Sequence, residues 1–191
     1  MNANDLKERL NAGRLNKEQI DVLVSALKEH PELTKPLLEE VFAQDAQKTS
    51  FNASWVFDHL MRKRLDLLLP HLDFFLKGTA VLQTESCRRP LAHVIELLCE
   101  AHFKSKLPQY TKTITVERQE KMVHICFDWL IGGHKVATKV FAMTSLFYLG
   151  ESHQWIRPEL RSIIEQLMPM GTAAFKNRGG KILAQLKNLG Y

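Results

Sequence analysis

The chain has 191 residues, of which 45% are hydrophobic and 25% are charged. These values are typical of a globular protein and exclude both a disordered chain and a membrane-embedded one. A domain of this length buries most of the apolar surface that its unfolded form exposes, so folding needs neither disulfides nor a structural metal. The net charge of +5 is modest, and by itself it does not indicate a nucleic-acid-binding protein.

The cellular compartment follows from three absences in the sequence. Pro70, His71 and Asp73 interrupt the longest apolar stretch well before the length of a membrane span. The first ten residues alternate charges and lack the apolar stretch of a secretory signal. The cysteines have no C-x-x-C spacing and fall in or beside apolar helical patterns, as reduced core thiols do: Cys87, Cys99 and Cys126. We therefore expect a soluble, cytoplasmic protein without a membrane association.

Helical periodicity begins near the N-terminus and continues along the chain, with no alternating strand pattern. Apolar residues recur on one helical face at Ile20, Leu23, Val24 and Leu27. Pro31 and Pro36 mark the next boundary, and a second apolar stripe follows at 37–42. A polar link at 44–50 separates this stripe from a further helix. The first 60 residues therefore predict helix after helix.

The later helical segments continue this order and predict consecutive hairpins. Gly132-Gly133 is a turn signal between two of them, and a link at 169–174 separates two others. The expected helical segments are 65–76, then 91–98, then the pair 122–131 and 136–149, and finally the pair 160–168 and 182–189.

A repeated register appears when these segments are laid over one another. Each of four segments places a polar or basic residue before a compact one: 51–55, 88–92, 138–142 and 177–181. The polar residues are Asn52, Arg89, Lys139 and Arg178, at intervals of 37, 50 and 39 residues. Two of these intervals match a helical repeat of about 40 residues. The long interval contains 104–115, which reads as an inserted loop of the kind that often carries binding.

The segment Arg88-Arg89-Pro90-Leu91-Ala92-His93-Val94-Ile95 is similar to the basic start of the second helix in a HEAT repeat, and weaker matches extend from about 32 to 189. This resemblance to HEAT and armadillo-like proteins implies an all-α fold, an α-α superhelix of about five helical hairpins stacked with a right-handed twist. It also implies one domain over 1–191, with 1–30 as a polar capping hairpin and 104–115 as the inserted loop.

The chain also resembles a group of short bacterial helical proteins that carry the name adenylosuccinate lyase. That superfamily uses a mobile Gly-Ser-Ser-x-Met-Pro loop whose serine takes part in proton abstraction. The nearest stretch here is Leu167-Met168-Pro169-Met170-Gly171, which lacks the serines. We therefore do not expect lyase activity.

HEAT-like folds include one enzyme class, the alkylpurine DNA glycosylases, which hold a lesion with aromatic residues and a carboxylate. The best local counterpart of their Trp-x-Arg-Arg run is Asp128-Trp129 followed by 134–139, and here that run has neither its aromatic residue nor its arginine pair. A cavity without an aromatic clamp has little to hold an extruded base. Nucleic-acid binding without the glycosylase site stays open as the alternative function.

Metal-ligating and catalytic patterns have simpler interpretations. Glu96, Cys99 and His102 lie three apart on one helix, and His124 with Cys126 would complete a zinc site only if four groups converged. We expect a core thiol and a helix-end histidine there instead, with no metal and no cofactor. The neighbours Asp58 and His59, like Asp73 near His71, are expected on solvated helix faces, because no nucleophile motif accompanies them. We expect no catalytic residues.

Basic residues are the feature that points to a function. Segment 171–191 has four cations and no acid, and 104–121 has five cations against two acids. The repeat surface aligns such charges along an acidic partner, which we expect to be another protein, with nucleic-acid phosphates as the alternative. The same residues would instead order the stack if acids of adjacent hairpins neutralise them. The candidate binding residues are Arg88, Arg89, Lys139, Lys176, Arg178 and Lys181. Most aromatic residues are expected in the core.

Overall fold

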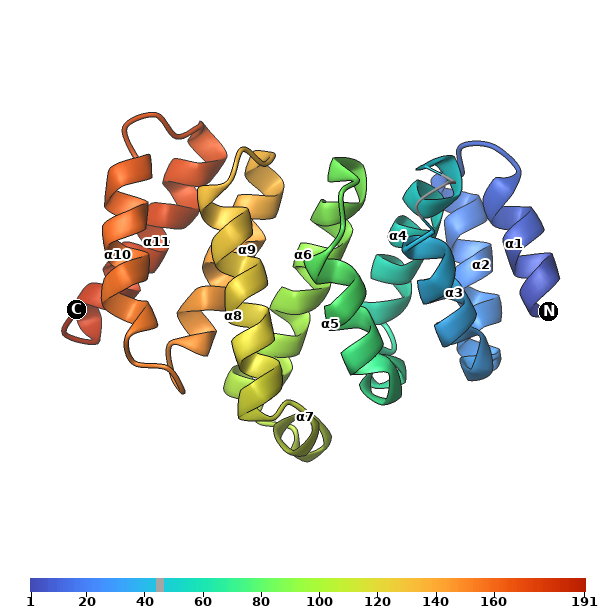
Figure 1. Ribbon diagram of the computed structural model, residues 1–191, viewed down its shortest axis with the longest axis horizontal. Coiled ribbons are helices and arrows are strands. Elements are labelled where there is room, and N and C mark those ends of the chain that lie inside the picture. The colour runs from blue at the N-terminus through green and yellow to red at the C-terminus, as the bar shows by residue number, and fades with distance from the viewer. Residues whose placement is uncertain (44–46) are drawn as a thin grey trace. The chain divides into compact units, whose positions relative to one another are not determined.

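The computed structural model describes residues 1–43 and 47–191, with the side chains at 47 and 48 excepted. Every regular element in these ranges is helical and none is a strand, which confirms the predicted all-α class. The chain divides into two compact units, 1–94 and 95–191 (Figure 1). The expected single domain stays a prediction. In the described ranges, no helix combines the length and the apolar character that crossing a membrane requires.

The first unit consists of three consecutive helix pairs, the third of which ends in the second unit. Short 3₁₀ turns at 31–33 and 65–71 precede the third and fifth helices. The helices are α1 (Ala3–Asn11), α2 (Lys17–Glu29), α3 (Thr34–Val41), α4 (Gln47–Met61), α5 (Leu72–Ala80) and α6 (Glu85–Cys99).

The first two helices begin at asparagine caps. Asn2 and Asn16 each accept a hydrogen bond from the backbone N–H three residues on, and the side-chain oxygens of Asp5 and Gln19 in turn accept from the N–H of the cap residue. These capping boxes satisfy backbone donors that a helix start leaves unpaired. The pair α1 and α2 lies where the sequence predicts the capping hairpin.

Helix α4 is the centre of the first unit, since α1, α2 and α3 all pack against it. Its inward face buries Val56, Phe57 and Leu60 completely. On the same helix, the Asn52 amide donates to the carbonyls of Leu10 (2.8 Å) and Gly13 (2.6 Å), and its oxygen accepts from the Leu15 N–H (3.2 Å). The repeated polar position at Asn52 therefore holds the loop between α1 and α2.

The second unit contains two further helix pairs and a short helix before them. A turn of π-helix at 100–104 follows α6. The helices are α7 (Pro108–Thr113), α8 (Val116–Ile131), α9 (Val136–Leu149), α10 (Ile156–Leu167) and α11 (Ala173–Asn188). The two pairs expected across Gly132-Gly133 and across the link before α11 are confirmed. The described chain thus has five consecutive helix pairs, as predicted.

The segment 104–115 is not a loop, and this prediction is wrong. It contains α7, which begins at Pro108, where the missing N–H of proline costs nothing. Tyr110 and Ile114 are buried, and the Arg118 guanidinium donates to the Thr113 carbonyl at 2.5 Å. The lysines and threonines obscured these two apolar anchors, which pack the segment onto its unit.

Two other boundaries differ from the prediction. The stretch 65–76 is a 3₁₀ turn to His71 followed by the start of α5, because Pro70 has no N–H to continue a helical ladder. The expected polar link at 44–50 is helical from Gln47 on, and residues 44–46 lie outside the described ranges.

The three cysteines are free and buried, as predicted. Burial raises the pKa of Cys99 well above its usual range, and that of Cys126 to about 12. Burial also raises the pKa of Cys87. Since the thiolate is the reactive form, these are inert core thiols.

Candidate binding surfaces

The six predicted binding residues all lie on the second helices of their pairs. Arg88 and Arg89 are on α6 in the first unit. Lys139 is on α9, and Lys176, Arg178 and Lys181 are on α11; these two helices pack against each other in the second unit (Figure 1). Each unit therefore has its own candidate surface.

Arg88 has a structural role. Its side chain is only 15% exposed, and its guanidinium donates to the Glu85 carboxylate at 2.7 Å and to the Leu82 carbonyl at 2.8 Å. These bonds close the turn between α5 and α6. The Arg88 guanidinium is therefore occupied within the fold and not available to a partner. The side chain of the neighbouring Arg89 is exposed.

Arg89 contacts an aromatic stripe on α4. Its Cζ atom lies 5.1 Å from the centroid of the Trp55 ring. The Trp55 ring is 6.1 Å from Phe51 and 6.4 Å from His59, so the three rings follow one another at intervals of four residues. The Cζ atom of Arg14 lies 5.6 Å from the centroid of the Phe51 ring. The aromatic stripe (Phe51, Trp55 and His59) is half-buried, whereas the sequence predicts most aromatic residues in the core.

Asp58, on the same helix, is buried and not on a solvated face. One of its oxygens accepts from His93 Nδ1 and the other from Arg62, both at 2.6 Å. Asp58 thus binds a histidine of α6, and its burial corrects the expectation of a solvated helix face. His59 has a lowered pKa because burial and the nearby Arg62 both disfavour its protonated form.

Arg178 orders the second unit. Its guanidinium donates to the Glu96 carboxylate at 3.1 Å and to the Thr144 hydroxyl at 2.5 Å. The next residue, Gly179, allows α11 to pack closely on α10, since a Cβ there would lie 3.0 Å from Met168 Sδ and 3.1 Å from Ile164 Cγ2. An acid of another helix thus neutralises Arg178. This is the alternative role expected for the basic residues, in which they order the stack.

Three lysines of the second unit have a different environment. Lys176 and Lys181 are exposed and Lys139 is half-buried. Within the described ranges none of the three has an ion-pair partner. Helices α9 and α11 contain no carboxylate, whereas their hairpin partners α8 and α10 carry the acidic residues Glu117, Glu120, Asp128, Glu159 and Glu165. We call Lys139, Lys176 and Lys181 the lysine surface.

The three lysines lie on two helices that pack against each other, Lys139 on α9 and Lys176 and Lys181 on α11. The bond from Arg178 to the Thr144 hydroxyl is one of the contacts between these helices. The lysine surface therefore spans two neighbouring helices of the second unit.

The possible zinc ligands Glu96, Cys99 and His102 have other roles in the structure. Glu96 binds Arg178, Cys99 is a buried thiol, and His102 Nδ1 lies 3.3 Å from the Tyr110 carbonyl. Across the described residues, no cluster of three or more His, Cys, Asp or Glu side chains could hold a metal ion. Nearby, burial and Glu100 raise the pKa of Tyr148 to about 12, and its hydroxyl donates to that carboxylate at 3.4 Å.

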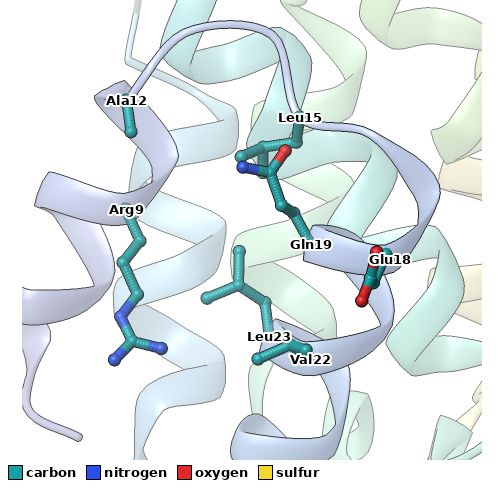
Figure 2. Close-up of a pocket in the computed structure, with 7 residues that line it drawn as sticks. All are labelled: Arg9, Ala12, Leu15, Glu18, Gln19, Val22 and Leu23. Carbon is teal, nitrogen blue, oxygen red and sulfur yellow. The ribbon is translucent and has the colours of Figure 1, made fainter.

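A groove of about 350 Å³ opens between α1 and α2 (Figure 2). Its lining is mainly apolar and includes Val22, which is 56% exposed. Two charged side chains are among its lining residues, Arg9 from α1 and Glu18 from α2, as Figure 2 shows.

Comparison with known proteins identifies a family. A family model described as a HEAT repeat domain matches residues 6–186, nearly the whole chain. The chain shows no match to curated proteins or to solved structures.

Proposed function

The chain belongs to the HEAT repeat family, and from this premise we propose that it is a non-catalytic binding protein that presents the second helices of its hairpins to a partner. The helix pairs of such repeats form extended surfaces for binding. We place the protein in the cytoplasm, a reducing compartment that suits its three unpaired, buried thiols.

The observation that carries this proposal is the lysine surface. Like charges that no carboxylate compensates repel one another, and this repulsion destabilises the folded state. The helices α9 and α11 nevertheless carry five cations and no acid. Arg178 alone among the named residues of this face is neutralised within the unit. Uncompensated charge on two adjacent helices is what an acidic partner would neutralise.

We propose an acidic segment of another protein as that partner. A lysine ammonium group is a point charge on a flexible side chain, so it can pair with carboxylates in many arrangements. Duplex nucleic acid would need several phosphate contacts for useful affinity, and three lysines supply few. The lysine surface therefore fits a short acidic segment better than it fits a DNA backbone.

Fluorescence anisotropy tests the proposal with a labelled Glu-rich peptide and with labelled duplex DNA, at low and moderate salt. We expect the peptide to bind. The variant K139E/K176E/K181E should bind it at least about tenfold more weakly, because the substituted carboxylates repel an acidic peptide that the lysines attract. The matched control K17E/K28E/K77E changes the charge equally at exposed lysines elsewhere and should bind like the wild type.

Three outcomes would contradict the proposal. Absence of peptide binding at low salt would remove it, as would equal loss in the control variant. Tighter, salt-sensitive binding of the duplex than of the peptide would identify nucleic acid as the partner class instead.

A further inference from the structure

The aromatic stripe on α4 combines ring faces with guanidinium groups in the first unit. Arg14 lies over Phe51 and Arg89 over Trp55, and Arg62 lies close enough to His59 to lower its pKa. Two of the three rings, Phe51 and Trp55, thus have an arginine over them, whereas Arg62 pairs with Asp58. The rings are half-buried, and the three arginines are exposed.

The stacked arginines keep their charge available. Neither Arg14 nor Arg89 has an ion-pair partner among the residues that the structure describes. Asp58, the carboxylate of α4 itself, is buried and already accepts from Arg62 and His93. A guanidinium group that rests on a ring by its face retains in-plane N–H donors, and these suit the bidentate binding of a phosphate.

We propose that this surface binds single-stranded nucleic acid. Phe51 and Trp55 follow one another along α4 at an interval of four residues, about 6 Å, and each has an exposed guanidinium group over it, so that rings and cations recur together, as bases and phosphates do along a strand. Proteins that bind single strands without sequence preference combine stacking rings with a basic track in this way. A duplex hides its base faces, so it would engage only the arginines. The site is distinct from the lysine surface and does not depend on the function proposed for it.

The test is anisotropy with labelled oligo-dT, labelled oligo-U, an abasic strand of equal length and a duplex. The wild type should bind the single strands in a salt-sensitive way, and the abasic strand at least about fivefold more weakly, since base stacking supplies part of the affinity. The difference between oligo-dT and oligo-U shows whether DNA or RNA is preferred.

Two variants locate the site. R14Q/R89Q alters exposed side chains only and should weaken single-strand binding about tenfold or more, whereas K17Q/K28Q, with the same charge change, should not. W55L should remove the preference for the normal strand over the abasic one, provided that thermal unfolding shows it to be folded.

Equal affinity for normal and abasic strands, or unchanged binding by R14Q/R89Q, would overturn the inference. Loss of binding in K139E/K176E/K181E with full binding in R14Q/R89Q would also overturn it, because nucleic acid would then use the lysine surface. Failure of the acidic peptide to bind, with single-strand binding intact, would reject the proposed function and leave this inference standing.

Discussion

Arg178 and Glu96 form an ion pair at 3.1 Å across 82 residues of sequence. The Glu96 carboxylate is 11% exposed, while the Arg178 side chain is 35% exposed. The pair, together with the bond from Arg178 to Thr144, joins the last hairpin to the helices before it. Arg178 is therefore a residue of the fold, although the sequence placed it among the binding residues.

Removing this arginine should destabilise the second unit. R178M removes a charged donor from a nearly buried carboxylate, and we expect the free energy of unfolding to fall by about 1–3 kcal/mol. Urea unfolding of R178M, E96Q and the double variant measures the coupling between the two side chains. Additive effects of the two substitutions would show that the ion pair contributes nothing.

The adjacent glycines of α11 should respond in opposite ways to substitution. A Cβ at Gly180 meets no atom within 4 Å, so G180A should stabilise by about 0.5–1 kcal/mol through helix propensity. At Gly179 the neighbours Met168 and Ile164 stand at 3.0 and 3.1 Å from such a Cβ, and G179V should destabilise. Thermal unfolding of both variants decides this, and a stabilising G179V would contradict the packing described for α10 and α11.

The buried acid on α4 should matter more than its exposed partner. D58L removes a carboxylate that is 1% exposed and accepts from both His93 and Arg62, and we expect the free energy of unfolding to fall by roughly 2–4 kcal/mol. R62A removes a side chain that is 45% exposed, and should cost at most about 1 kcal/mol. Denaturant unfolding compares them. Equal losses would show that the burial of Asp58 has no energetic consequence.

Stability should decline at alkaline pH because of the core thiols. Burial raises the pKa of Cys126 from 9.0 to about 12, so between these values the unfolded chain loses a proton that the folded chain keeps. The unfolding free energy then falls as pH rises above 9. Urea unfolding from pH 8 upward measures this fall, which should be smaller in C126A. A fall of equal size in C126A would assign it to other groups, such as Tyr148, whose pKa is also raised.

Much of the fold could be predicted from local patterns. The face of Ile20, Leu23, Val24 and Leu27 is buried in α2, and the glycine turn between α8 and α9 lies where expected. Apolar spacing and turn residues are local signals, and they suffice for helix pairs. The helix around Tyr110 could not be predicted, because two apolar residues among lysines give too weak a period to indicate a helix.

The roles of the basic residues could not be predicted in the same way, because they depend on distant partners. The carboxylate that accepts from Arg178 belongs to Glu96, which lies 82 residues earlier in the chain. The contact of Arg14 with Phe51 spans 37 residues. The spacing of Phe51, Trp55 and His59 was visible, but a stripe of rings at helical intervals more often indicates a core face. Their partial exposure became apparent only in three dimensions.

The most direct test of the proposed function is lysine acetylation measured by mass spectrometry, with and without the Glu-rich peptide at saturating concentration. Bound peptide should slow acetylation at Lys139, Lys176 and Lys181, because it covers their ammonium groups. The rates at the exposed lysines 17, 28 and 77 should not change. Protection of those distant lysines, or unchanged rates at all six, would contradict a binding surface on α9 and α11.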